Sequence, residues 1–191
     1  HGAAAAPSVT EGTTVSYKVG EGDWTTEFPT ITNVGEVTVS VKAVNSNYDD
    51  ATTSYTLKVT KRAITLVSAD SSKFFDETPL KAEIVKISEG EFVQNEGFAY
   101  QFTGVQTSVG TSENKFTVSA KEGTLVDNYA VTLAYGTLAV NPVVTFVMNG
   151  HGEEVEKQNV ALGSKAIAPA EPSETGYTFE GWFIDDAFEN R

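Results

Sequence analysis

The chain contains no cysteine, and only one methionine and two histidines, among its 191 residues. Without cysteine it has no disulfide, no thiol nucleophile and no thiolate metal ligand, so its stability depends on packing. The histidines are His1, at the terminus, and His151, in a glycine-rich turn. We therefore expect no histidine-based metal site, no serine–histidine catalytic pair and no cofactor, which predicts a protein that is not an enzyme.

Basic residues are also scarce, with 13 Lys and Arg against 26 Asp and Glu and a net charge of −13. Such a balance repels nucleic-acid phosphates and anionic lipid surfaces. No apolar run approaches the roughly 20 residues that span a bilayer. We therefore expect no binding to nucleic acid and no membrane insertion.

The acidic residues are dispersed, and the adjacent pairs Asp49–Asp50 and Asp185–Asp186 are the candidates for acid–base chemistry or calcium binding. Neighbouring strand residues point to opposite faces, however, and neither pair has the spaced oxygen ligands of a calcium loop. We interpret both pairs as solvated loop residues.

The sequence is rich in alternating apolar and polar residues, the period of a half-buried β-strand. Val37, Val39 and Val41 share one face of the clearest example, and Thr38, Ser40 and Lys42 share the other. Further strands are predicted over Val15–Val19, Trp24–Phe28, Tyr55–Val59, Ile64–Ser68, Leu80–Lys86 and Tyr100–Phe102, with a turn over Phe74–Leu80. The pattern predicts an all-β protein.

Four elements occur twice in the same order, which indicates tandem homologous modules. The matching pairs are Val34–Gly35 with Val109–Gly110, Thr38–Ser40 with Thr117–Ser119, Asn47–Tyr48 with Asn128–Tyr129, and Thr56–Val59 with Thr137–Val140. We predict a first module over 1–62 that lacks its opening strand, a second over 63–142 closed by Asn141–Pro142, and a different module over 143–191.

The third region has a predicted strand over Val143–Val147, a turn over Asn149–Gly152 and the string Gly176–Trp182, followed by no closing strand. This pattern resembles a Listeria–Bacteroides repeat, the B-repeat type of internalins. The resemblance implies a small β-grasp-like module, truncated here, of the kind found in bacterial surface proteins.

Residues 63–142 resemble surface repeats of the MBG or YDG type. Phe75–Leu80 stands where those repeats have Tyr-Asp-Gly-Thr-Pro-Leu, and Asn128–Tyr129 and the segment Gly136–Val140 agree with them. The first module looks like a relative of the second. Together the resemblances imply small antiparallel β modules, β-sandwich or β-grasp-like, in an extracellular protein of a bacterial cell surface, associated with the cell wall.

These features predict an elongated, monomeric stalk or adhesion region that spaces a head domain from the wall. The alternative is a module that binds a host glycan or protein, or other modules of its own chain, as an accessory part of a polysaccharide-degrading enzyme. Trp24 is the candidate for stacking on a ligand, whereas Trp182 is expected to pack internally. Lys42 and Lys121 lie opposite the apolar face, so we expect no isopeptide cross-link there.

Overall fold

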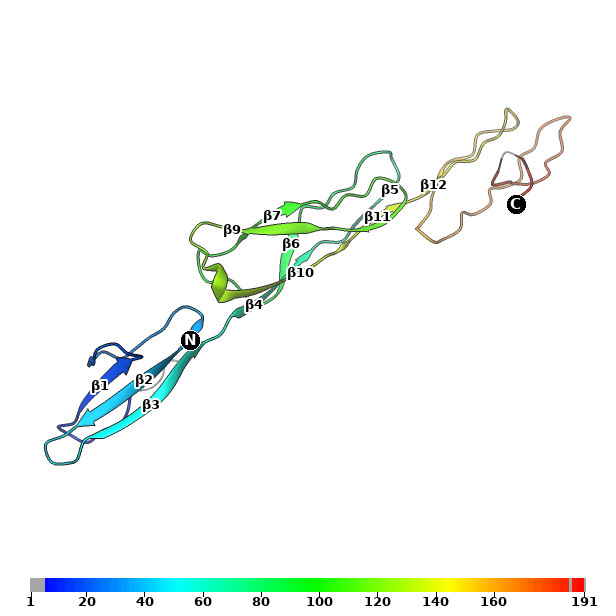
Figure 1. Ribbon diagram of the computed structural model, residues 1–191. Helices are drawn as coiled ribbons and strands as arrows, with labels where there is room; N and C mark the ends of the chain where they lie inside the picture. The colour runs from blue at the N-terminus through cyan, green and yellow to red at the C-terminus, as the bar shows by residue number, and fades with distance from the viewer. Residues whose placement is uncertain (1–5, 186, 191) are drawn as a thin grey trace. The chain divides into compact units, whose positions relative to one another are not determined.

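The computed structural model describes residues 6–185 and 187–190, so His1 and Asp186 lie outside the described residues. Over these residues the all-β prediction is confirmed: thirteen short strands form five sheets of two or three strands, with one 3-10 helix at Val126–Asn128 (Figure 1). Within the same residues, no helix has the length and apolarity needed to cross a membrane.

The contacts within the chain divide it into two compact units, and each unit consists of more than one segment. The first comprises His1–Ile64, Glu89–Gly97 and Glu122–Thr132, and the second comprises Thr65–Ser88, Phe98–Lys121 and Leu133–Arg191. The module boundaries that we place after residues 62 and 142 stay a prediction.

The first unit contains an antiparallel sheet of order β1-β2-β3, formed by β1 (Thr14–Val19), β2 (Gly35–Val44) and β3 (Ala51–Val59). Val39 is fully buried at its centre and pairs with Val19 on one side and Tyr55 on the other. Its core consists of Tyr17, Val39 and Val41, against which Val15, Phe28, Tyr55 and Leu57 pack. The apolar face predicted from the alternation is confirmed.

Lys42 lies on the opposite face of β2, where its Nζ is 3.0 Å from Asp50 Oδ2 and both side chains are substantially exposed. A lysine that is paired at the surface with a carboxylate is not enclosed with an asparagine. The predicted position of Lys42 opposite the apolar face is confirmed, and the absence of an isopeptide bond stays a prediction.

The strand predicted over Trp24–Phe28 is wrong, because only Thr25 pairs there, through two backbone hydrogen bonds with Tyr17 of 2.7 and 2.8 Å. The Thr25 hydroxyl accepts a hydrogen bond from the Glu27 N–H at 3.1 Å. Such a local side-chain contact competes with a strand ladder. Phe28 nevertheless packs on the core, with its ring centroid 5.3 Å from that of Tyr17.

Elsewhere in the first unit, Asn128 contacts the turn that precedes β2. Its Oδ1 accepts a hydrogen bond from the Val34 N–H at 2.8 Å, and its Nδ2 donates to Asn33 Oδ1 at 3.2 Å. Arg62 Nη1 lies 3.2 Å from the Glu91 carbonyl oxygen and 3.3 Å from its carboxylate. In these contacts the side chains of Asn128 and Arg62 form hydrogen bonds with residues that are distant in the sequence.

The remaining strands are β4 (Arg62–Ser68), β5 (Ser71–Phe74), β6 (Val85–Glu89), β7 (Phe98–Phe102), β8 (Gly110–Glu113), β9 (Phe116–Ala120), β10 (Tyr129–Ala134), β11 (Thr137–Asn141), β12 (Val143–Val144) and β13 (Gln158–Asn159). They form sheets of order β10-β4-β6, β5-β11-β8, β7-β9 and β12-β13. The β11–β8, β12–β13 and β7–β9 pairs are antiparallel, whereas β5 and β11 run parallel. Hydrophobic alternation does not predict the parallel pair, because β5 is short and mostly polar.

Two predicted strands are shorter than expected. The segment predicted as Leu80–Lys86 becomes a strand only from Val85, while Leu80 forms a single bridge with Gln106. The strand predicted over Val143–Val147 ends at Val144, because its partner β13 has two residues. In both places the available partner, rather than local propensity, determines the length.

The repeat is visible in the strand register of both copies. In the first copy Gly35 pairs with Val59 and Val37 with Leu57, and in the second Gly110 pairs with Val140 and Ser112 with Leu138. The Val–Gly element and the last matched strand therefore pair alike in the two copies, whereas Thr38–Ser40 pairs with β3 and its match Thr117–Ser119 pairs with β7.

The second copy divides the equivalent of β2 into β8 and β9 at Asn114, which is completely buried. Its Nδ2 donates to the carbonyl oxygens of Ala69 and Ala82, both at 2.9 Å. Its own carbonyl oxygen accepts a 2.6 Å hydrogen bond from the Ser68 hydroxyl. A buried amide thus satisfies two backbone carbonyls that lie outside any ladder.

Candidate functional site

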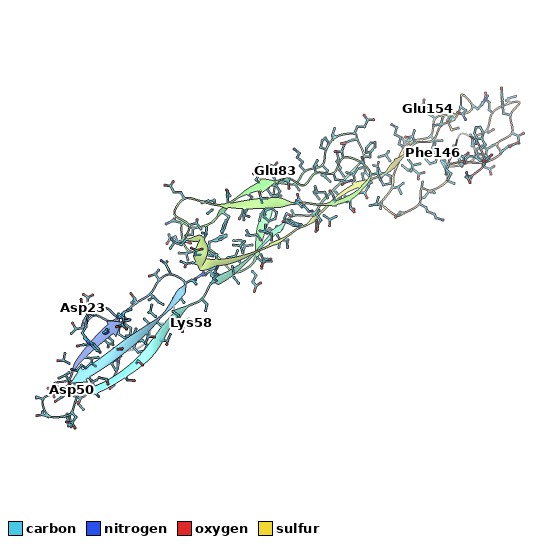
Figure 2. All side chains as sticks on the ribbon, in the orientation of Figure 1. Asp23, Asp50, Lys58, Glu83, Phe146 and Glu154 are labelled. Atoms are coloured by element: carbon cyan, nitrogen blue, oxygen red, sulfur yellow. The ribbon has the colours of Figure 1, made fainter. Side chains whose placement is uncertain are left out.

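Trp24 is the residue for which the sequence predicts ligand stacking, and it follows a loop at Gly20–Asp23 whose last residue, Asp23, is labelled in Figure 2. Gly20 has φ +54°, a conformation that glycine adopts without strain and that turns the chain toward Trp24. The indole is 47% exposed. An exposed indole face next to a carboxylate-bearing loop has the properties of a sugar-stacking group, and its role as a ligand contact stays a prediction.

A second candidate is an aromatic cavity of about 1260 Å³ formed entirely by residues between Val144 and Phe188. Trp182 lies in its wall, with ring centroids 5.2 Å from Phe146 and 5.3 Å from Phe179, both edge to face. The indole Nε1 lies 3.4 Å from the Pro169 carbonyl oxygen. Trp182 is therefore partly buried and packs on two aromatic rings, which agrees with the expected packing role but places it at a cavity wall and not in a closed core. Phe146, one of these rings, is labelled in Figure 2.

The rim of the aromatic cavity carries an exposed histidine–carboxylate pair that the sequence reasoning missed. His151 Nδ1 is 3.1 Å from Glu174 Oε2, which also accepts the Gly152 N–H at 3.0 Å. The Tyr177 ring lies over the imidazole at a centroid distance of 4.0 Å. The only sequence signal was the glycine-rich turn, where Gly152 has φ +76° and allows its N–H to face the carboxylate.

This arrangement can bind a polar or cationic group between a carboxylate and an aromatic face. Its side chains remain about half exposed. His151 contacts Glu174 and Tyr177.

One carboxylate of each acidic pair considered for calcium, Asp50 and Asp185, interacts with other groups of the protein. Asp50 pairs with Lys42, and the Asp185 carboxylate accepts hydrogen bonds from the backbone N–H groups of Ala187, Glu189 and Asn190 at 2.9 to 3.2 Å. The Asn190 amide, which also donates to Asp185, and these backbone groups lower the Asp185 pKa. No group of three or more histidine or acidic side chains suited to a metal ion occurs within residues 6–185 and 187–190.

A further charged cluster closes the turn after β5. Lys73 Nζ donates to Asp76 Oδ1 and to the Thr78 carbonyl and hydroxyl oxygens, and the Thr78 N–H donates to Asp76 at 3.0 Å. The hydrogen bond from Lys73, followed by those from Thr78, holds the Asp76 pKa far below its ordinary value. Asp76 and Thr78 lie in the string that resembles the MBG or YDG motif, Lys73 lies just before it, and together they stabilise a turn.

Comparison with known proteins identifies one region. Residues 143–191 match the family model of the Listeria-Bacteroides repeat domain. No curated protein and no solved structure matches the chain. The resemblance of the third region to this family is therefore confirmed, and the aromatic cavity and its rim lie within the matched residues.

Proposed function

We propose that the chain is a non-catalytic spacer of a bacterial cell-surface protein. In this proposal residues 1–142 are MBG- or YDG-type modules, the protein is extracellular and associated with the cell wall, and the stalk acts as a monomer. The observation that carries the proposal is the shared strand register of the two copies, in which Gly35–Val59 and Gly110–Val140 are equivalent pairs. Strung modules add length without requiring an active site.

The match of residues 143–191 to the Listeria-Bacteroides repeat family supports the surface location, because the resemblance to that family implies a bacterial surface protein. The acidic composition supports a well-solvated chain with little tendency to associate. A head domain that binds or acts on a target would then be carried elsewhere in the parent protein.

Small-angle X-ray scattering tests the spacer role. A compact chain of 191 residues has a radius of gyration of about 16 Å. We expect a clearly larger value, together with a Kratky plot that returns toward the baseline as it does for folded modules. A radius near 16 Å would contradict the spacer, and a Kratky plot that keeps rising would indicate an unfolded chain instead.

The second candidate function is binding of a glycan or host protein, and the exposure of Trp24 is the observation that favours it. If Trp24 stacks on sugar rings, Trp24→Ala should abolish binding on a glycan array, because the substitution removes the whole stacking face. Tyr48→Ala is the matched control, since Tyr48 is a 68% exposed aromatic of the same unit. Equal binding by both variants would exclude Trp24 as the ligand contact.

A further inference from the structure

Strand β3 is an open edge of its sheet. It lies last in the order β1-β2-β3, and the part of the chain that the structure describes places no strand on its outer side. Its nine residues, ATTSYTLKV, include no proline and one charge, Lys58, whose Nζ is held 2.9 Å from Glu36 Oε2 on β2. Edges that stay free in solution usually carry proline, bulges or several charges. β3 has the composition of a strand that is covered.

The second copy shows what covers the equivalent strand. Leu138 and Val140 of β11, which match Leu57 and Val59 of β3, are completely buried, whereas Leu57 and Val59 are only partly buried. β11 pairs on one side with β8, as β3 pairs with β2, and on its other side with β5. Leu80 and Ala82 then pack on Leu138 and Val140.

The covering segment is a short stretch of chain, residues 69–83. Before β5, the Asp70 carboxylate accepts the Thr137 N–H at 2.7 Å, and after β5 the Phe75 N–H donates to the Asn141 carbonyl at 2.8 Å. Between these contacts β5 runs parallel to β11, with Ser71 opposite Leu138. The cluster of Lys73, Asp76 and Thr78 then turns the chain so that Leu80 reaches the apolar face.

We propose that the outer edge of β3, with the adjoining face of Leu57 and Val59, is a binding site for a β-segment of the same repeat type as residues 69–83. The bound segment runs parallel to β3, an acidic side chain accepts the Thr56 N–H, and a leucine covers Leu57 and Val59. The partner is thus defined by three features that the second copy uses at the equivalent strand. The interaction is strand addition, in which main-chain hydrogen bonds give affinity and side-chain contacts give specificity.

The test uses the full chain and a synthetic peptide with the sequence of residues 69–83. Amide hydrogen exchange resolved by residue should slow by about ten-fold or more within Tyr55–Val59 when the peptide is added, because new strand pairing protects these groups. A peptide carrying Leu80→Asp should bind at least about ten-fold more weakly, since it loses the apolar cover. A scrambled peptide of the same composition is the second control.

Three outcomes of this experiment would overturn the proposal. The first is that the 69–83 peptide fails to bind a chain that hydrogen exchange shows to be folded, and the second is that it slows exchange only in β11. The third outcome is that the Leu80→Asp peptide binds with the same affinity as the unchanged peptide. Self-association of the chain through β3, detected by sedimentation and abolished by Thr56→Pro, would also overturn it, because the edge would then prefer a second copy. The result is independent of the spacer role: a compact particle in scattering leaves this site intact, and a non-binding peptide leaves the spacer standing.

Discussion

Phe116→Ala is expected to lower the free energy of unfolding of the second module by about 3 to 5 kcal/mol, the range for deleting a buried phenylalanine side chain. Phe116 is 1% exposed and is among the largest fully buried side chains of the protein. It starts β9 and pairs in register with Phe102 of β7. Removing it therefore opens a cavity on the face of the β7–β9 sheet where its ring packs among other aromatic rings.

The aromatic neighbours of Phe116 explain why the cavity would not collapse. Its ring centroid lies 6.0 Å from Tyr100 and 5.6 Å from Tyr135, both nearly perpendicular to it, and 5.8 Å from Phe102. Edge-to-face pairs contribute beyond their buried area, and rigid rings relax little into a void. The measured loss of stability should therefore include most of the free energy of burying the ring and most of the cost of the cavity it leaves.

The measurement is native-state hydrogen exchange at the amides of β7 and β9, which reports the stability of this sheet directly. Phe75→Ala is the matched control. Because Phe75 is 39% exposed, this variant should lose less than half the free energy of unfolding that Phe116→Ala loses. Trp24 and Trp182 lie outside residues 63–142, so their fluorescence reports on other parts of the chain. Similar losses for the two variants would contradict the assignment of Phe116 as the centre of this core.

The all-β class and the buried face of β2 could be predicted because both depend on local patterns. Alternation at Val37, Val39 and Val41 determines which face packs, whatever the partner strand is. The repeated Val–Gly element also predicted the register, since the glycine begins β2 in one copy and β8 in the other.

Features that depend on distant partners could not be predicted. Asn114 is buried because the carbonyl oxygens of Ala69 and Ala82 need a donor, and nothing next to Asn114 in the sequence signals this need. The same contact engages the Ala82 carbonyl oxygen, in the stretch between Leu80 and the start of β6 at Val85 that forms no strand.

The candidate site was predicted only in part for the same reason. The stacking contacts of Trp182 with Phe146 and Phe179 agree with the expectation that this indole packs internally. The contact of His151 with Glu174 joins two loops separated by more than twenty residues. Loop-to-loop contacts have no periodic signature, so a single sequence does not reveal them.

Leu138→Ala and Leu57→Ala form a matched pair, because the same residue type occupies the same register position in the two copies. Leu138 is completely buried and packs with Leu80 and Val140. Its truncation should destabilise the second module by about 2 to 5 kcal/mol, the range for buried leucines. Leu57 is only partly buried, so its truncation should destabilise the first module by about half that amount or less.

Hydrogen exchange at β11 and β3 measures the two losses separately. Addition of the 69–83 peptide should then make the loss at Leu57 approach that at Leu138, because the bound segment buries the leucine that it covers. Equal losses without peptide would mean that β3 is already covered to the same degree as β11. If the peptide leaves the difference between the two losses of unfolding free energy unchanged, it does not cover Leu57. The reason is that the two leucines occupy equivalent positions, so the free-energy cost of truncating each one depends on how deeply its face is buried.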